Sequence, residues 1–263
     1  MSETFLEKIV AKTRENVERQ KLEVDLDALR VRALETRAHT KSRRLRSALS
    51  REGETNIIAE IKRASPSKGV INAEVDVAAL AKQFETGGAA AISVLTESEY
   101  FRGSIDDLLA ARAVVDLPIL RKDFTVDEFQ IYEAAAAGAD AVLLIVAALN
   151  ESELRRFLRL VQDELGMDAL VEVHDREELD TAVRIGANIV GVNNRNLHSL
   201  EVSLDVSRRL IGDRPEHILM VAESGISIRD EIDELKKLGF DGFLIGETLM
   251  RTADAAGTLG GWI

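Results

Sequence analysis

The chain has 263 residues, of which 46% are hydrophobic and 30% charged, and its formal net charge is −12. This length is enough for one large domain or two small ones, and the acidity argues against general nucleic-acid binding, which needs a basic footprint. The absence of cysteine excludes disulfides, thiol catalysis and thiolate metal sites.

Residues 1–50 are predicted to be helical. Phe5, Ile9 and Val17 recur at helical spacing and form an apolar stripe. No glycine occurs before Gly53. We therefore expect an N-terminal helical extension that packs on something larger.

The same N-terminal segment is basic. Residues 1–51 contain thirteen Lys and Arg against eight Asp and Glu, a net charge of +5, so the remainder carries −17. The run from Lys41 to Arg51 could bind anions, although such runs more often form the solvated face of a helix. The N-terminus lacks the apolar core of a signal peptide, and no apolar stretch is long enough to span a membrane. We expect a cytoplasmic protein.

From residue 57 onward, short apolar runs alternate with helix-like segments. Such continuous apolar strands, joined by helical crossovers, predict a parallel sheet that is buried on both faces. The predicted strands are residues 57–62, 90–96, 118–122, 141–146, 168–173, 189–193, 218–222 and 241–246.

A glycine repeat runs through this region. Gly88, Gly138, Gly186 and Gly239 precede every second strand at spacings of 50, 48 and 53 residues and fit helix ends in the left-handed conformation. Four repeats of two strands and two helices predict a closed α/β structure, a (βα)8 TIM barrel. The alternative is an open doubly wound sheet, which usually has fewer strands and often a G-x-G-x-x-G turn. We expect a single domain over 1–263, with the extension at 1–50 and the barrel at 57–263.

Charged residues close the odd-numbered strands. Lys62, Lys122, Glu172 and Glu223 end the first, third, fifth and seventh strands, and Glu60 points the same way as Lys62 because side chains alternate along a strand. Active sites of this barrel lie at the C-terminal ends of the strands. The charges therefore predict an enzyme, and the alternative is a lattice of salt bridges that plugs the barrel.

Polar loops follow two of the strands. The segment RASPSKG after the first strand offers Ser65, Ser67 and Lys68 as donors, or is an ordinary polar loop. Asn193 ends the sixth strand, where a neutral amide can hydrogen-bond a substrate. Arg195 follows and can hold a carboxylate or phosphate in a bidentate fork, unless this is only an Asn-rich turn.

Glycine-containing loops follow the seventh and eighth strands. Ser224 and Gly225 come after the seventh, and Gly246 and Glu247 after the eighth. Barrels often bind phosphate between these loops through backbone N–H groups. Glu247 would have to turn its charge away from such a phosphate, and plain turns are the alternative.

The histidines show no metal-ligand spacing, which favours surface positions for them, and we predict no metal site. They are His39, His174, His198 and His217. His174 follows Glu172 by two positions and could share its face. Phe101 and Phe124 could cover an aromatic substrate or pack in the core.

The segments IIAEIKRASPSKG, SVLTESEYFRGS, LPILRKDFTVDEFQI, LVEVHDREEL, VGVNNRNL, VAESGI and LIGETLM, in this order, resemble the indole-3-glycerol phosphate synthase family. The resemblance covers nearly the whole chain. It implies a carboxy-lyase of tryptophan biosynthesis with a TIM barrel fold. The implied reaction converts 1-(2-carboxyphenylamino)-1-deoxyribulose 5-phosphate to indole-3-glycerol phosphate, releasing carbon dioxide and water.

The resemblance also implies residue roles. Lys122 would be the general acid at the carbonyl, Glu172 the base or proton shuttle, and Lys62 a substrate contact and acid in dehydration. Glu60 and Asn193 would orient the lysines and the hydroxyl, and Glu223 would hold the intermediate. We expect Lys62 and Lys122 to face one another, which together with desolvation would lower their pKa values.

The implied substrate-binding residues surround this group. Arg195 would lie near the anthranilate part, and the phosphate at the ends of the last two strands. The family often has serine at the position of Glu247, so only a backbone contact carries over there. The set is Ser65, Arg195, Ser224, Gly225, Leu244, Gly246 and Glu247.

Two rival functions stay open. An isomerase of the same fold would share the phosphate loops but commonly uses cysteine or aspartate, and a non-catalytic phosphate-binding barrel would lack Lys122 or Glu172. We expect a phosphorylated small-molecule partner, no cofactor, no nucleic acid, no membrane contact, and a monomer or weak oligomer.

Overall fold

The computed structural model describes residues 4–42, 44–197 and 199–263, and its centre is a closed barrel of parallel strands. The strands follow the order β1-β10-β9-β8-β7-β6-β5-β4 around the barrel, and β1 also pairs with β4. This confirms the predicted (βα)8 barrel, and each strand lies within one residue of its predicted bounds. The barrel strands are β1 (Ile57–Ile61), β4 (Ala91–Leu95), β5 (Ile119–Lys122), β6 (Ala141–Ile145), β7 (Asp168–Val173), β8 (Ile189–Asn193), β9 (Leu219–Glu223) and β10 (Gly242–Ile245).

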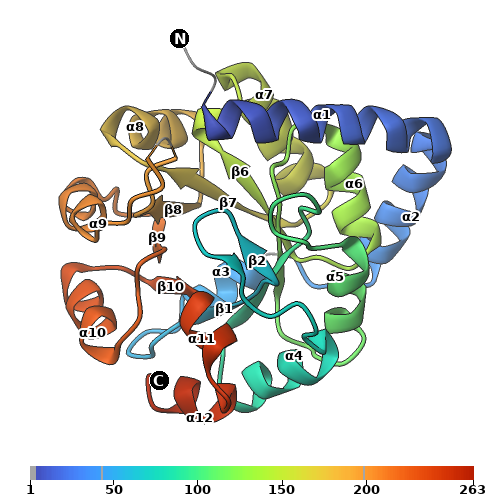
Figure 1. Ribbon diagram of the computed structural model, residues 1–263. Coiled ribbons are helices and arrows are strands. Elements are labelled where there is room, and N and C mark those ends of the chain that lie inside the picture. The colour runs from blue at the N-terminus through green and yellow to red at the C-terminus, as the bar shows by residue number, and fades with distance from the viewer. Residues whose placement is uncertain (1–3, 43, 198) are drawn as a thin grey trace.

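Helices surround the barrel on its outside (Figure 1). Gly88, Gly138, Gly186 and Gly239 have φ angles of 87°, 84°, 88° and 112°, so the predicted left-handed positions before alternate strands are confirmed. The helices after the first strand are α4 (Val77–Thr86), α5 (Ile105–Arg112), α6 (Glu128–Ala136), α7 (Glu151–Arg159), α8 (Arg176–Ile185), α9 (Asp205–Leu210), α10 (Arg229–Leu238), α11 (Glu247–Arg251) and α12 (Ala255–Gly260). Short helical turns are η1 (Val146–Ala148), η2 (Leu160–Glu164) and η3 (Ile211–Asp213).

Three helices precede the barrel: α1 (Phe5–Glu23), α2 (Leu26–Ala38) and α3 (Arg44–Leu49). Thr4 and Glu7 cap the start of α1 reciprocally, through N–H to side-chain hydrogen bonds of 3.2 and 2.7 Å. The predicted apolar stripe is buried at Ile9 and Val17. Figure 1 shows α1 and α2 (blue) beside α6, in agreement with their contacts.

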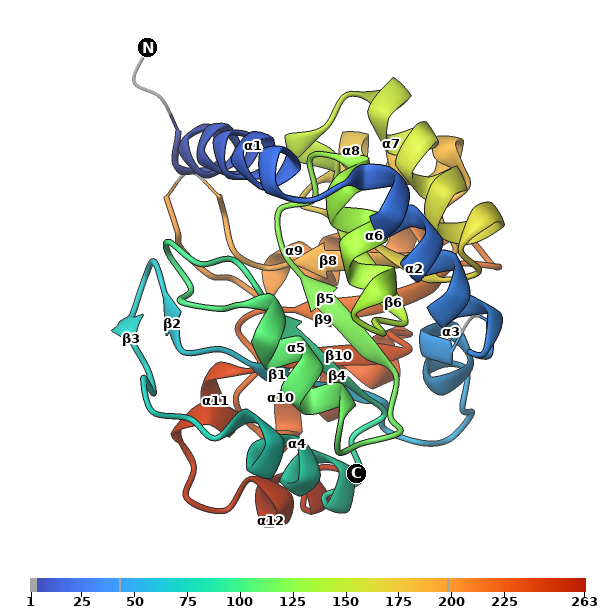
Figure 2. The ribbon, with the colours of Figure 1, turned by 90° about the vertical axis from the view of Figure 1, so that its right-hand side faces the viewer.

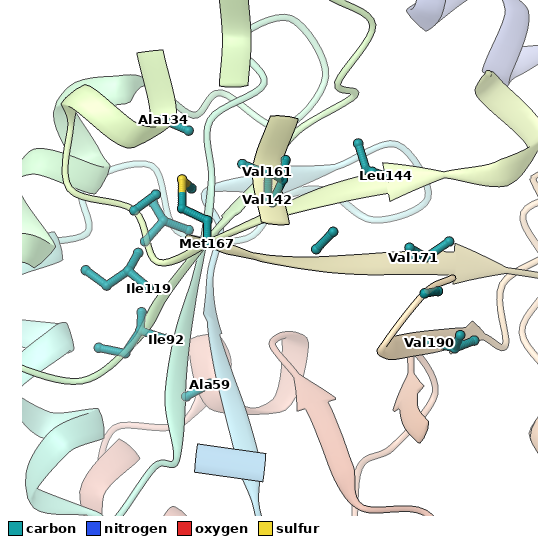
Figure 3. Close-up of a cluster of buried hydrophobic side chains, with 14 of the residues drawn as sticks. Ala59, Ile92, Ile119, Ala134, Val142, Leu144, Val161, Met167, Val171 and Val190 are labelled. Atoms are coloured by element: carbon teal, nitrogen blue, oxygen red, sulfur yellow. The ribbon is translucent and has the colours of Figure 1, made fainter. Parts of the chain in front are cut away.

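The apolar core has two parts. Inward-facing residues such as Ile58, Leu120 and Leu170 fill the barrel, and Leu45 and Leu49 of α3 join them. A larger cluster fills the layer between the strands and the outer helices, and part of it is drawn in Figure 3. Helix α3 therefore closes the N-terminal end of the barrel, which leaves the C-terminal end for a site.

The basic run was expected to be an anion-binding arm or a solvated helix face, and Arg44 is neither. Its guanidinium donates to both oxygens of Asp140 at 3.2 Å, and the Asp140 side chain is fully buried. Arg37 of α2 and Arg112 of α5 approach the same carboxylate at 3.7 and 3.0 Å. The arginines tie the N-terminal helices to the barrel.

The loop after β1 forms a hairpin, β2 (Ala64–Ser65) and β3 (Gly69–Val70). Figure 2 shows this hairpin at the opposite end of the molecule from α3. The hairpin therefore stands beside the C-terminal ends of the strands. Within the described ranges, none of the helices is long and apolar enough to cross a membrane.

Candidate active site

The charged residues predicted from the strand ends meet at the C-terminal end of the barrel. The Lys122 ammonium lies 3.5 Å from Oε2 of Glu172 and 3.3 Å from Oε2 of Glu223. Lys62, one residue beyond β1, donates to Oε1 of Glu60 at 2.7 Å. The salt-bridge lattice considered as an alternative does form, but it lines a pocket and does not plug the barrel.

All thirteen predicted catalytic and substrate-binding residues line this one pocket. They come from distant parts of the sequence because the parallel strands all end at the same face of the barrel. The group comprises Glu60, Lys62, Ser65, Lys122, Glu172, Asn193, Arg195, Glu223, Ser224, Gly225, Leu244, Gly246 and Glu247. Neighbouring lining residues include Ser67, Phe101 and Phe124.

The expectation of a lowered pKa for Lys122 is wrong. Burial alone would lower the pKa of Lys122, but the carboxylates of Glu223, Glu172 and Glu60 raise it well above its usual range. Desolvation is outweighed because three carboxylates converge on one ammonium group. Lys122 is therefore fully protonated at neutral pH, as a proton donor must be.

The two glutamates beside Lys122 differ in protonation. Burial would raise the pKa of Glu172, but Lys122, His174 and Asn193 lower it to about 2. For Glu223, burial and the neighbouring carboxylates outweigh Lys122 and raise the pKa to about 8. Such divergence between adjacent carboxyl groups allows one to act as a base while the other carries a proton.

We expect the raised pKa of Glu223 to appear in the pH dependence of stability. The folded state holds a proton that the unfolded chain loses above its ordinary pKa of 4.5. The stabilising contribution is therefore present below pH 4.5 and is lost as the pH rises towards 8. Because Glu223→Gln stays neutral, the free energy of unfolding of wild type should fall relative to this variant across that window in urea titrations. A constant difference would contradict the raised pKa.

Asn193 and Arg195 connect the end of β8 to its surroundings. Asn193 donates from Nδ2 to Oε1 of Glu172 at 3.0 Å, while its Oδ1 accepts from the backbone N–H of Arg195 at 3.0 Å. The Arg195 guanidinium donates to Oγ of Ser67 and to the carbonyl of Leu200, both at 3.0 Å. The loop after β8 thus contacts the hairpin after β1 across the pocket.

The loops after β9 and β10, which were predicted to bind phosphate, both line the pocket. Ser224 and Gly225 have φ angles of 65° and 83°, and for a serine this left-handed backbone is strained. Asn194 holds the turn by donating to the carbonyl of Ser224 at 3.1 Å. The Glu247 carboxylate pairs with Arg251 at 3.2 Å and with Lys68 at 3.7 Å, so its charge is directed to two cations.

Gly191 is a functional position that sequence reasoning missed. A Cβ built on it would lie 1.9 Å from Oε1 of Glu223, so only glycine leaves room for this carboxyl group. A lone glycine inside an apolar strand was the available signal, because it often marks a close approach. Gly246 has a similar role, since its Cβ would lie 2.5 Å from Oε1 of Glu60.

We expect Gly191→Ala to displace Glu223 and lower turnover strongly while the barrel still folds. The matched control is Gly212→Ala, because a Cβ there meets nothing within 4 Å and φ is not positive. Steady-state kinetics and circular dichroism of both variants would check this. Unchanged turnover in Gly191→Ala would show that the position of Glu223 does not matter.

Aromatic side chains form one wall of the pocket. Phe101 and Phe124 have ring centroids 6.3 Å apart. Both line the pocket, as required by the prediction that they could cover an aromatic substrate. Phe5 of α1 also lines it and packs edge-on against Tyr100 with a centroid distance of 5.0 Å. Sequence reasoning assigned Phe5 only to the apolar stripe, because nothing local shows that α1 reaches the pocket.

His174 does not lie on the surface, as the histidine spacing had suggested. Its ring contacts Glu172 and Glu178, and its side chain is only 15% exposed. His39 and His217 are exposed as predicted, and His198 lies outside the described residues. In the described part of the chain, no group of three or more His, Cys, Asp or Glu could hold a metal ion.

Comparisons with known proteins agree with this geometry. The model of the family described as indole-3-glycerol phosphate synthase matches residues 6–259. The chain belongs to the indole-3-glycerol phosphate synthase family. A synthase of this name from Carboxydothermus hydrogenoformans is 47% identical over 254 residues, 95% of this chain and 96% of its own. One from Sulfurimonas denitrificans is 45% identical over 258 residues, 97% of each chain.

Solved structures add support for the fold alone. Thiamine phosphate pyrophosphorylase from Pyrococcus furiosus superposes with a TM-score of 0.60 at 19% identity, covering 83% of this chain and 95% of that one. The family assignment therefore rests on the synthase relatives and on the family model, and the barrel is shared more widely.

Proposed function

We propose that this protein catalyses ring closure, decarboxylation and dehydration of 1-(2-carboxyphenylamino)-1-deoxyribulose 5-phosphate to indole-3-glycerol phosphate in tryptophan biosynthesis. The observation that carries the proposal is the pairing of Lys122 with Glu172 and Glu223 in a pocket that the loops after β9 and β10 also line. Family membership supports the same reaction.

Lys122 supplies the proton for ring closure. Its ammonium group polarises the substrate carbonyl while the aromatic carbon that bears the carboxylate attacks, and the carbonyl oxygen becomes a hydroxyl. Loss of carbon dioxide returns the bonding electrons to the ring and restores aromaticity. General acid assistance of this kind is typically worth about 10²–10⁴-fold.

Dehydration needs an acid and a base on the same intermediate. Lys62, which Glu60 holds at 2.7 Å, donates a proton to the leaving hydroxyl. Glu172 accepts the proton from the adjacent carbon, since its low pKa keeps it ionised. Glu223 hydrogen-bonds the intermediate through its buried Oε1, which has no hydrogen-bond partner among the described residues, while Oε2 faces Lys122 at 3.3 Å.

The substrate ends are held by different loops. The phosphate binds at Ser224, Gly225, Gly246 and the backbone of Glu247, where left-handed glycine allows close approach. Arg195 contacts the anthranilate carboxylate, and Leu244 packs beneath. Ser65 donates to the ligand, because its buried Oγ makes no hydrogen bond to any described residue.

The direct test is product formation from the purified substrate. Indole fluorescence should rise when wild-type protein is added, and the rise should need no added metal. A boiled sample and Gly191→Ala serve as controls. No fluorescence change with folded wild-type protein would refute the proposed function.

A further inference from the structure

We propose that His174, held by Glu178, is a positioning residue that fixes the orientation of the Glu172 carboxylate toward Lys122. This inference rests on the role proposed above for Glu172. It concerns a chain of three side chains that runs from the pocket to the start of α8.

The two oxygens of Glu172 face different partners. Oε2 faces the pocket, where Lys122 lies at 3.5 Å. Oε1 faces away from it, accepts from Asn193 at 3.0 Å, and lies 3.4 Å from Nε2 of His174. Asn193 holds Oε1 from one side, and the contact of Oε2 with Lys122 is long at 3.5 Å. The imidazole of His174 holds Oε1 from a second direction, which limits rotation of the carboxylate.

The imidazole of His174 is itself immobilised from behind. A single oxygen, Oε2 of Glu178, accepts from the backbone N–H of His174 at 2.8 Å and lies 3.0 Å from its ring Nδ1. The ring and the main chain are thus held by one carboxylate. Nε2 is buried and makes no hydrogen bond to a described residue, so Glu172 is the group it faces.

The position of Glu178 follows from the local fold. Asp175 caps α8 by accepting from the backbone N–H of Glu178 at 2.9 Å. Glu178 therefore sits one turn into the helix and its side chain reaches back to His174. A carboxylate behind an imidazole sets which ring nitrogens carry protons, and so which atom can donate to the catalytic group.

Charge supports the same arrangement. Burial would lower the pKa of His174, but Glu172 and Glu178 raise it to about 10. Among the described residues, the ion-pair partners of the ring are Glu172 on β7 and Glu178 on α8, with Lys122 on β5 beyond Glu172. An imidazolium between two carboxylates presents one N–H to each of them, Nδ1 to Glu178 at 3.0 Å and Nε2 to Glu172 at 3.4 Å. The alternative is that Glu178 merely caps α8.

Steady-state kinetics separate these possibilities. We expect His174→Leu to lower kcat by about 10- to 100-fold, by analogy with the residues that orient metal ligands, with KM changed less than about twofold. His174→Gln should recover part of kcat, because its amide can still donate to Glu172. The control is Asp180→Asn on the same helix, whose exposed pair with Arg176 lies outside the site. Unchanged kcat in folded His174→Leu would overturn the proposal.

A second measurement needs no substrate. In NMR spectra of isotope-labelled wild-type protein, the ring signal of His174 is the one that is lost in His174→Gln. It should show a protonated imidazole at pH 8, and in Glu178→Gln its titration midpoint should fall to a lower pH. A ring that is neutral at pH 7.5 in wild type would overturn the proposal, even if the variants fold poorly. If wild-type protein were inactive, the proposed function would be refuted instead. The ring titration would still report whether His174 is held between Glu172 and Glu178.

Discussion

Lys122→Met is expected to lower turnover by more than ~10²-fold, because no other ammonium group lies between Glu172 and Glu223 among the described residues. Methionine keeps most of the aliphatic stem, so the barrel should fold. Loss of the positive charge also raises the pKa of Glu172, since the attraction that favours its ionised form disappears. The variant therefore loses the acid and also the charge that favours the ionised form of Glu172.

The kinetic comparison needs a lysine that lies outside the site. Lys82→Met on α4 removes an ammonium group that pairs with the nearby surface residue Glu85 at 2.9 Å, and it should leave turnover unchanged. Indole fluorescence gives the rate, and circular dichroism confirms folding. Near-normal turnover in Lys122→Met would show that Lys122 is not the general acid. It would leave the family assignment unchanged.

Asp140→Asn is expected to be strongly destabilising, although it lies outside the pocket. The carboxylate is fully buried, faces Arg37, Arg44 and Arg112, and accepts from the backbone N–H of Ile119 at 3.0 Å. Asparagine has the same size but no charge, so three guanidinium groups would lose their shared counter-ion. Breaking a buried ion pair typically costs ~3–5 kcal/mol, which urea denaturation measures readily.

A half-exposed ion pair provides the matched control for this stability test. Asp233→Asn removes a carboxylate that pairs with Arg229 one turn away on α10 at 2.9 Å. Such surface pairs contribute about 0–1 kcal/mol. If both variants shifted the urea midpoint equally, the arginine cluster would not be what attaches the N-terminal helices to the barrel.

The fold was predictable because its signals are local and repeated. Apolar runs place the strands to within one residue, and glycines such as Gly138 mark helix ends through a backbone conformation that other residues rarely adopt. The site was predictable for a related reason. Parallel strands all end at one face, so Lys62, Lys122 and Glu172 had to meet once the barrel was assumed.

The predictions that were wrong or incomplete share a different cause. The pKa of Lys122 depends on how many carboxylates converge on it, and no spacing along the chain reveals that number. His174 appeared to be a surface histidine because its partner Glu178 lies on the next helix and is brought back by a cap. Phe5 reaches the pocket only because the start of α1 lies beside it.

The sequence by itself determined the closed barrel, the family and the identity of the residues around the pocket, because periodicity and motifs are written in neighbouring positions. Only the tertiary structure decided which charges pair, since an ion pair depends on distances of a few ångströms between residues far apart in the chain. Asp140 shows the difference: in the sequence it follows a helix-ending glycine, whereas in the fold it neutralises arginines from α2, α3 and α5.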